Sequence, residues 1–238
     1  CPKADAVLIL SREACGFAYR SSVFKRNLEA GRIVVSVTLR LRPGGDPTIR
    51  YGELARRIEG TTDLARVRDE VLALRRSKSM VVDPEDPNSR SAGSFFMNPI
   101  VDSDRLAVVE RGAQRCGVDP ASMPRWPTPD GQFKLAAAWL IERAGLTKGY
   151  IRGRAGLSER HTLAIINRGD ASAREIVELA AQVRATVLDI FGIGLVPEPV
   201  FLGFTRPTVD LLDETQRLGR MPDPRVRTSG DALRRGST

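Results

Sequence analysis

Residues 172–192 read S-A-R-E-I-V-E-L-A-A-Q-V-R-A-T-V-L-D-I-F-G, the clearest helical pattern in the chain. Ser172 and Glu175 have the spacing of a capping box, in which each side chain accepts a hydrogen bond from the other residue's backbone N–H. Gly192 ends the pattern, because glycine readily takes the left-handed conformation that closes a helix. Apolar residues recur at helical spacing on one face: Ile176, Leu179, Val183, Val187 and Ile190. The sequence therefore predicts a long helix with one buried stripe.

Shorter elements are predicted on both sides of this helix. Apolar residues at helical spacing predict helices at 63–78, 104–114 and 134–144. Alternating or apolar runs predict strands at 4–10, 33–41, 99–101, 162–167 and 196–203. Helices and strands do not alternate in a regular βαβ order and no repeat is visible, so the predicted fold is α+β (mixed α/β).

The composition is typical of a globular protein with one large or two ordinary domains. The chain has 238 residues, of which 42% are hydrophobic and 28% are charged. No apolar run reaches the length of about 18 residues that a membrane-spanning helix needs. The three cysteines are far apart without C-x-x-C spacing, and His161 is the single histidine. These counts predict neither a disulfide framework nor a metal site, and they fit a reducing cytoplasm.

The net charge of +8 predicts attraction to an anion, whether nucleic acid, anionic lipid or a phosphorylated small molecule. Basic residues are scattered rather than gathered in one block, so the charge permits an anionic ligand without selecting one. A basic helix–turn–helix drawn over residues 135–151 keeps a DNA-binding module as an alternative. Its second helix, continued past residue 151, would contain Gly149, Gly153 and Gly156, each of which costs about 1 kcal/mol relative to alanine.

Ser94 is the first candidate catalytic residue. It stands in residues 92–99, A-G-S-F-F-M-N-P, after a polar run rich in turn residues, so the segment is predicted to be a loop that enters a short apolar strand. A serine hydroxyl on a loop shielded by aromatic side chains is placed to give or take a proton. An ordinary turn that leads into a core strand accounts for the same residues.

Arg20 and Glu198 are the other two catalytic candidates. Arg20 lies in residues 17–25, F-A-Y-R-S-S-V-F-K, where its guanidinium can grip a carboxylate with two parallel hydrogen bonds. Glu198 lies between Pro197 and Pro199, which restrict the backbone and hold the carboxylate in a set direction. A solvated arginine, and an edge strand protected by proline and charge, are the alternatives.

Four side chains are candidate anion ligands: Tyr51, Lys78, Asn98 and Lys134. Taken singly, each is better explained as a solvated side chain. His161 precedes a predicted strand and is typical of a structural or surface histidine.

Seven motifs, taken in their order along the chain, resemble the UDP-N-acetylenolpyruvoylglucosamine reductase (MurB) family, flavoenzymes of peptidoglycan precursor synthesis. The motifs are F-A-Y-R-S-S-V-F-K, R-Y-G-E-L, L-R-R-S-K, A-G-S-F-F-M-N-P, P-x-P-D-G-Q-F-K-L-A-A-A-W-L-I-E-R-A-G, L-S-E-R-H-T-L-A-I-I-N and F-G-I-G-L-V-P-E-P-V-F-L-G. The resemblance runs from about residue 4 to residue 203. Seven ordered motifs are far more specific than any one of them.

The resemblance implies a catalytic role for three residues. Ser94 would be the general acid that protonates the substrate carbon after hydride has arrived, and Arg20 and Glu198 would polarise the substrate carboxylate. Hydride addition to an enolpyruvyl ether pushes negative charge toward the carboxylate, where a preorganised arginine can stabilise it. A glutamate fits beside that charge when it is protonated or shares a proton with the developing enol.

The resemblance also implies substrate-binding positions, which are Tyr51, Lys78, Asn98, Lys134 and His161. Tyr51 is similar to the tyrosine of a loop that closes over the substrate in one subtype of the family. Lys78 and Asn98 are similar to residues near the UDP diphosphate, and Arg75 is the one candidate flavin ligand in this chain. Two positions depart from the family: Met97 stands where lysine is frequent, and Trp126 where tyrosine is frequent.

The implied activity is a flavin-dependent reduction in the cytoplasm. Reduced FAD, regenerated by NADPH, passes a hydride to the enolpyruvyl group of UDP-N-acetylglucosamine enolpyruvate and yields UDP-N-acetylmuramate. The implied partner is a UDP-sugar with its diphosphate, and no nucleic acid, membrane or metal partner is implied. The oligomeric state is not implied by any motif.

The resemblance divides the chain into four parts. Residues 1–83 would be the back part of an FAD-binding domain of the PCMH/vanillyl-alcohol-oxidase type, and 84–192 a C-terminal α/β substrate-binding domain. Residues 193–205 would be a return strand that carries Glu198, and 206–238 a disordered polar tail. The family's N-terminal flavin-binding portion would lie upstream of residue 4, so a folded but inactive fragment is the alternative to a working reductase.

Overall fold

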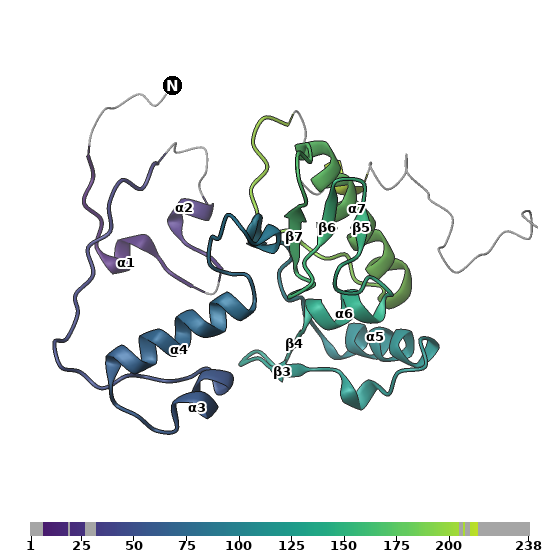
Figure 1. Cartoon of the computed structure of the whole chain (residues 1–238). Helices are drawn as coiled ribbons and strands as arrows, with labels where there is room; N and C mark the ends of the chain where they lie inside the picture. Colours follow the sequence, from purple (N-terminus) through teal and green to yellow (C-terminus); the bar gives the residue numbers. More distant parts are fainter. Residues whose placement is uncertain (1–6, 19, 27–31, 205–206, 208–209, 214–238) are drawn as a thin grey trace, which may run out of the picture. The chain divides into compact units, whose positions relative to one another are not determined.

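The computed structural model describes residues 7–18, 20–26, 32–204, 207 and 210–213 (Figure 1). The chain divides into two compact units, the first covering Cys1–Asp46 and the second covering Pro47–Thr238. The second unit contains helices and antiparallel sheets, which agrees with the predicted α+β class. No helix among the described residues is both long and apolar enough to cross a membrane.

The described residues of the first unit include two single-turn helices, α1 (Arg12–Cys15) and α2 (Val23–Arg26). The Ser11 hydroxyl accepts a hydrogen bond from the Ala14 N–H and so caps α1. Gly16 ends α1 in the left-handed conformation, with a φ of 53°. Arg20 follows in the turn between the helices, also with a left-handed φ, of 54°.

The strands predicted at 4–10 and 33–41 are wrong where the structure describes them. Residues 7–11 and 32–42 belong to no helix or strand, and their apolar side chains are largely exposed. Alternating apolar residues favour a strand, but a strand also needs a neighbour to bond with and a surface that buries one face. The described residues supply neither, whereas residues 4–6 lie outside the described part.

The second unit begins with a pair of helices, α3 (Gly52–Ile58) and α4 (Leu64–Ser77). Leu54, Ile58 and Leu74 form a small buried cluster between them. The Asp63 carboxylate accepts a hydrogen bond from the Ala65 N–H and caps α4. The helix predicted at 63–78 is therefore confirmed to within a residue at each end.

Two antiparallel sheets form the rest of the framework. The four-stranded sheet has the order β1-β7-β6-β5, and its strands are Ser91–Ser94 (β1), Ile151–Arg152 (β5), Ala155–Leu157 (β6) and Ala164–Asn167 (β7). The three-stranded sheet has the order β2-β4-β3, and its strands are Ile100–Val101 (β2), Arg125–Pro127 (β3) and Phe133–Leu135 (β4). Single turns of 3-10 helix occur at Pro87–Ser89 (η2) and Pro120–Ser122 (η3).

Three helices build the main core: α5 (Ser103–Arg115), α6 (Ala137–Arg143) and α7 (Ala173–Phe191). The last of these packs against β6, β7, α5 and α6 (Figure 1). Gly112 lets α5 approach the end of α7, since a Cβ there would lie 2.5 Å from the Ile190 carbonyl oxygen. The capping box predicted at Ser172 and Glu175 is present, and Gly192 ends the helix with a φ of 69°.

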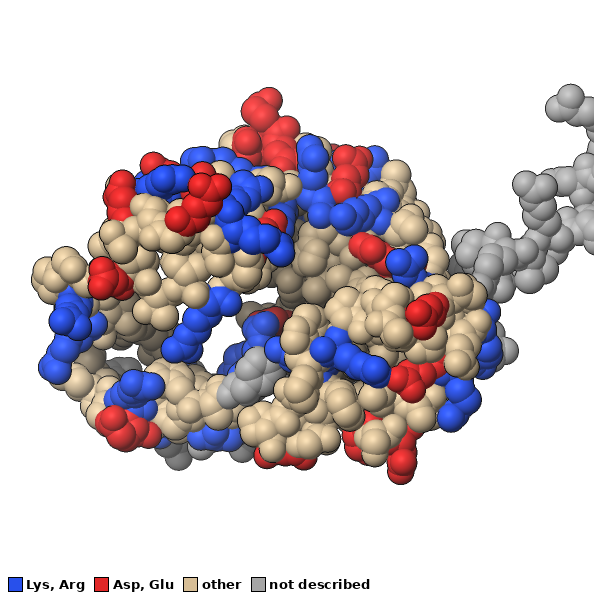
Figure 2. Space-filling view, turned by 90° about the horizontal axis from the view of Figure 1, so that it is seen from below, with Lys and Arg blue, Asp and Glu red and all other residues tan. Residues whose placement is uncertain are grey.

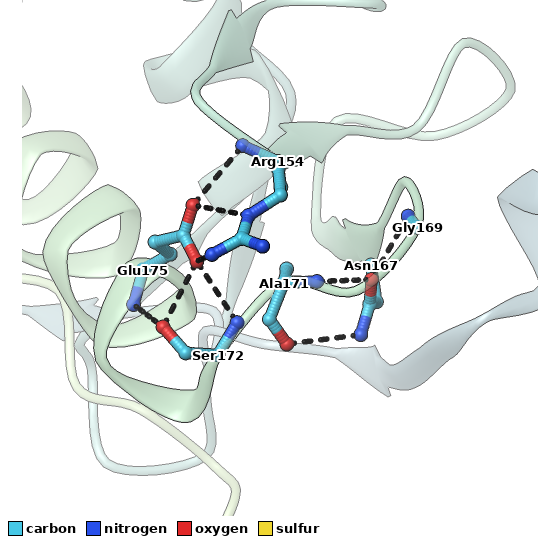
Figure 3. A network of polar contacts seen from close by, with 6 residues as sticks. All are labelled: Arg154, Asn167, Gly169, Ala171, Ser172 and Glu175. Atoms are coloured by element: carbon cyan, nitrogen blue, oxygen red, sulfur yellow. Dashed lines mark hydrogen bonds and ion pairs between the residues drawn. The ribbon is translucent and has the colours of Figure 1, made fainter.

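A polar network holds the start of α7 to the turn between β5 and β6 (Figure 3). The Arg154 guanidinium donates two hydrogen bonds to the Glu175 carboxylate, at 3.2 and 3.0 Å. Arg154 and then Ser172 lower the pKa of Glu175 to about 2. Asn167 stabilises the turn that leads into α7, because its side-chain oxygen accepts hydrogen bonds from the N–H groups of Gly169 and Ala171.

Residues 134–157 differ from the prediction in two places. Lys134 belongs to strand β4, and the helix predicted at 134–144 begins only at Ala137. The glycine-rich passage that follows contains the β5–β6 hairpin, which the sequence reasoning missed. Gly149 and Gly153 have φ values of 76° and 57°, which a right-handed helix does not allow. The second helix of the DNA-binding alternative is therefore wrong.

The end of the described chain also differs from the prediction. Residues 196–203 form no strand, and the only ladder contact there is an isolated antiparallel bridge between Phe96 and Pro197. Residues 210–213 form a helical turn in which Leu212 is completely buried. The expected polar tail from residue 206 thus includes a turn that joins the core, and residues 214–238 lie outside the described part.

Two leucines of α7 should contribute differently to stability, because one lies on the buried face of the helix and the other does not. Leu179 is fully buried, whereas Leu188 is 36% exposed on the same helix. We expect Leu179→Ala to lower the free energy of unfolding by about 2–5 kcal/mol, because it removes buried methyl groups and leaves a cavity. Leu188→Ala is the matched control and should cost less than about 1 kcal/mol. Urea denaturation followed by circular dichroism measures both, and equal losses would contradict the packing.

Candidate functional site

Ser94 is the last residue of strand β1 and is partly buried. It pairs with Ala164 of β7, and the next residue, Phe95, donates its N–H to the Leu163 carbonyl oxygen at 2.7 Å. The prediction placed Ser94 in a loop, and this is corrected because β7 supplies hydrogen-bonding partners for it. Ser94 therefore belongs to the end of a hydrogen-bonded sheet rather than to a surface loop.

Glu198 lies beside this sheet end. Its N–H donates to the Phe95 carbonyl oxygen at 2.8 Å, and the Met97 N–H donates to the Val196 carbonyl oxygen at 2.9 Å. These two bonds flank the bridge between Phe96 and Pro197. The structure therefore brings the segments of Ser94 and Glu198 together, although 104 positions separate them in the sequence.

Two aromatic side chains anchor the Ser94 segment. Phe95 and Phe96 are 3% and 2% exposed and pack edge to face, with ring centroids 5.2 Å apart. Phe95 also contacts the Phe201 ring at 6.0 Å, downstream of Glu198. The rings thus belong to the core, and the contact with Phe201 links the Ser94 segment to the chain that follows Glu198.

Asn98 has a structural role in this fold. Its side-chain oxygen accepts a hydrogen bond from the Ala137 N–H at 2.9 Å, at the first residue of α6. The helix has Ala136 at its N-cap position, which offers no side-chain oxygen of its own. A distant residue therefore caps the helix, and the amide oxygen of Asn98 is already used by the protein.

Lys134 lies on the three-stranded sheet between two neighbours, Ile100 of β2 and Trp126 of β3. Its ammonium lies 5.4 Å from the centroid of the Trp126 ring, a cation–π distance. Trp126 is 46% exposed, so one part of the ring is open to solvent. Lys134, a substrate-binding candidate, and Trp126, where the family frequently has tyrosine, thus lie side by side on this sheet.

Tyr51 and Lys78 are brought together with Glu53, a residue that the sequence reasoning did not single out. The Lys78 ammonium donates to the Glu53 carboxylate and, at 3.0 Å, to the Tyr51 hydroxyl. The Tyr51 hydroxyl donates to the same carboxylate at 3.0 Å. Hydrogen bonding to Glu53 and then to Tyr51 raises the pKa of Lys78 above its ordinary value.

His161 is partly buried near two cations. Burial lowers its pKa, and the positive charges of Lys78 and Lys148 lower it further, while Glu142 acts in the opposite direction. The imidazole is therefore neutral at pH 7 and can accept a hydrogen bond. This environment could not be read from the sequence, since Lys78 stands 83 positions away.

The remaining two candidates lie elsewhere. Arg75 donates from its guanidinium to the Met80 carbonyl oxygen at 2.9 Å, a contact that closes the end of α4. Arg20 belongs to the first compact unit and is exposed there, whereas the other candidates belong to the second. Its motif neighbour Tyr19 lies outside the described residues.

The surface charge is mixed. Figure 2 shows Lys and Arg side chains interspersed with Asp and Glu side chains over the face in view. Within the described part of the chain, no group of three His, Cys, Asp or Glu side chains is arranged to hold a metal ion. The described ion pairs, such as Arg125 with Glu110, neutralise some of the basic residues.

Comparison with known proteins gives the same family as the motifs. Residues 84–202, half of the chain, match the family described as UDP-N-acetylenolpyruvoylglucosamine reductase, C-terminal domain. Three proteins named UDP-N-acetylenolpyruvoylglucosamine reductase are similar to this chain over the aligned residues. They come from Thermobifida fusca, Saccharopolyspora erythraea and Mycolicibacterium smegmatis and are 49%, 48% and 46% identical to this chain. These matches cover 85%, 80% and 80% of this chain and 58%, 53% and 54% of those proteins.

The single histidine allows a direct test of the electrostatics. Because the folded state holds the pKa of His161 below its ordinary value of 6.5, the unfolded state binds the proton more readily. We expect the imidazole resonance to titrate below pH 6.5, and the free energy of unfolding to fall as the pH drops from 6.5 through the folded pKa. Lys148→Met should raise this pKa, and the control Lys134→Met should leave it in place. Titration at or above 6.5 in an NMR experiment would contradict the structure.

The family match spans Ser94, Asn98, Lys134, His161 and Glu198, and it agrees with the resemblance seen in the seven motifs. The chain spans a little over half the length of the relatives named above. It belongs to the UDP-N-acetylenolpyruvoylglucosamine reductase family.

Proposed function

We propose that this chain provides the substrate-binding and proton-donating part of a reductase that converts UDP-N-acetylglucosamine enolpyruvate to UDP-N-acetylmuramate. The observation that supports this proposal most is the backbone pairing of Phe95–Met97 with Val196–Glu198. It places a hydroxyl and a carboxyl group on adjacent segments at one end of a sheet. The relatives that are 46–49% identical to this chain are named UDP-N-acetylenolpyruvoylglucosamine reductase, which also supports the proposal.

The proposed chemistry gives Ser94 and Glu198 different tasks. Hydride addition to the enolpyruvyl double bond leaves negative charge on the adjacent carbon and on the carboxylate. The Ser94 hydroxyl gives its proton to that carbon as a general acid. Glu198 lies next to the developing charge and stabilises it in its protonated form, and Arg20 is the proposed cation for the substrate carboxylate.

The substrate diphosphate is proposed to bind near Lys78. Lys78 is cationic at neutral pH, and its ammonium is already oriented by Glu53 and Tyr51. Because Glu53 balances this charge when no substrate is bound, a diphosphate would compete with that carboxylate. Lys134 and Trp126 form the other proposed contact, and the exposed ring offers a stacking face.

FAD and NADPH are proposed as cofactor and co-substrate of the whole reductase, where FAD supplies the hydride. The described residues account for little of a flavin site. Residues 32–42 belong to no helix or strand and expose their apolar side chains, and the Arg75 guanidinium donates to the Met80 carbonyl oxygen. No step of the proposed mechanism therefore depends on flavin contacts within this chain.

The activity is proposed to be cytoplasmic, which fits the free cysteines Cys15 and Cys116.

A second candidate is a folded chain that binds the UDP-sugar but does not turn it over by itself. The exposed apolar residues of 32–42 favour this reading, because a working flavin domain would bury them. Both readings share the substrate site described above. They differ only in whether the 238 residues suffice to hold the flavin.

The flavin content of the purified chain distinguishes the two readings. We expect the 238-residue protein to bind the UDP-sugar in calorimetry yet to show no stoichiometric flavin absorbance after purification. A protein with one bound flavin per chain would contradict this expectation and would favour the complete reductase.

The role of Ser94 can be measured in a hybrid that joins the N-terminal part of the Thermobifida fusca relative to this chain. Ser94→Ala should slow oxidation of the reduced flavin by the enolpyruvyl substrate by about 10²–10⁴-fold, because a positioned acid is removed. Flavin reduction by NADPH should stay unchanged. Ser91→Ala, at the other end of the same strand, is the control. If both half-reactions slowed equally in stopped-flow experiments, the serine would be structural.

A further inference from the structure

Arg184 has the least exposed side chain among the arginines of the described ion pairs. It lies in the middle of α7, and its side chain is 12% exposed. A guanidinium that is removed from water requires hydrogen-bond partners and a counter-ion. Arg184 has both, and they come from two segments that follow the helix.

The first partner is the backbone that leads to Glu198. The Arg184 Nη1 donates to the Leu195 carbonyl oxygen at 2.7 Å. Gly194 makes this approach possible, because a Cβ at that position would lie 2.7 Å from the same Nη1 atom and 3.0 Å from Cζ. The Leu195 side chain is fully buried, so core packing holds this residue in addition to the hydrogen bond from Arg184.

The second partner is the helical turn at 210–213. The Arg184 Nε and Nη2 donate to the two carboxylate oxygens of Asp213, at 2.7 and 3.4 Å. Leu212, in the same turn, is fully buried. Asp213 lies beyond residues 84–202, so the family match does not include this ion pair.

The segment between these anchors carries the proposed catalytic carboxyl group. Only two residues, Val196 and Pro197, separate Leu195 from Glu198. The far end is held by the bonds of Val196 and Glu198 to the backbone of residues 95–97. A shift of the Leu195 carbonyl group would therefore be passed on to Glu198, because Pro197 leaves little freedom to absorb it.

We infer that Arg184 and Asp213 are positioning residues that hold the Glu198 segment against the end of strand β1. In this role both side chains act through the backbone that leads to Glu198 and not on the substrate. Arg184 bridges the helix to the catalytic segment, and Asp213 keeps the guanidinium oriented toward Leu195. The catalytic consequence rests on the proposed function, whereas the structural consequence does not.

Amide hydrogen exchange in the 238-residue chain tests the structural consequence. Asp213→Asn should raise the exchange rates of the Met97 and Glu198 N–H groups by at least about tenfold, because these bonds depend on the position of residues 195–198. The Leu157 and Arg168 N–H groups, which bond within the β5–β6–β7 region, should not change. Glu110→Gln removes the charge of another ion pair, Arg125 with Glu110, and is the matched control.

Arg184→Lys keeps the positive charge but loses the forked geometry, so it should loosen the same two amides while the protein stays folded. The inference is overturned if Asp213→Asn leaves both amides protected, or if it accelerates exchange uniformly across the β5–β6–β7 region. The second pattern would mean that the ion pair only stabilises the fold.

The hybrid reductase tests the catalytic consequence. Asp213→Asn should slow the oxidation of reduced flavin by the enolpyruvyl substrate by about 10- to 100-fold, the effect of a small misplacement of a catalytic group. Flavin reduction by NADPH should be unchanged, and Glu110→Gln should leave both rates unchanged. Unchanged substrate reduction in Asp213→Asn would overturn the catalytic role. A hybrid that is inactive with Asp213 intact would count against the proposed function, while the exchange result would still decide the inference.

Discussion

The burial of α7 is the interaction on which the main core of the second unit depends. Leu179, Val183 and Val187 are fully buried along this helix, which contacts both the four-stranded sheet and the helices α5 and α6. A dry apolar face of this kind supplies most of the stability of a helix, since isolated helices are marginal in water. The helix also carries Arg184 on its flank and ends at Gly192, so its position determines where the catalytic segment begins.

The candidate site is built mainly from backbone hydrogen bonds. Pro197 and Pro199 have no N–H, so Glu198 offers the single backbone donor in that tripeptide, and this donor bonds to the Phe95 carbonyl oxygen. A segment with one donor has few alternative registers, so a short bridge is enough to fix the backbone of Glu198 beside Phe95. The buried rings of Phe95 and Phe96 hold the opposite side of the pairing in place.

Differences between expectation and structure arise where a pattern depends on distant partners. The alternating residues at 33–41 favour a strand, yet strand formation requires a neighbour and the described residues provide none. The apolar run at 134–144 fits a helix by composition, but pairing with β2 and β3 draws residues 133–135 into a sheet. In the passage from Gly149 to Gly156, the left-handed glycines shape a hairpin that helical spacing alone cannot reveal.

The sequence by itself determined the long capped helix, the α+β class, and a family whose ordered motifs named Ser94 and Glu198. These conclusions depend on contacts within a few residues, such as the Ser172–Glu175 box, or on the order of motifs along the chain. Only the tertiary structure showed that Asn98 caps a helix 39 positions away, that Glu53 holds Lys78, and that Asp213 pairs with Arg184. Such contacts depend on how the whole chain packs, because a side chain meets a distant partner only after the core has formed.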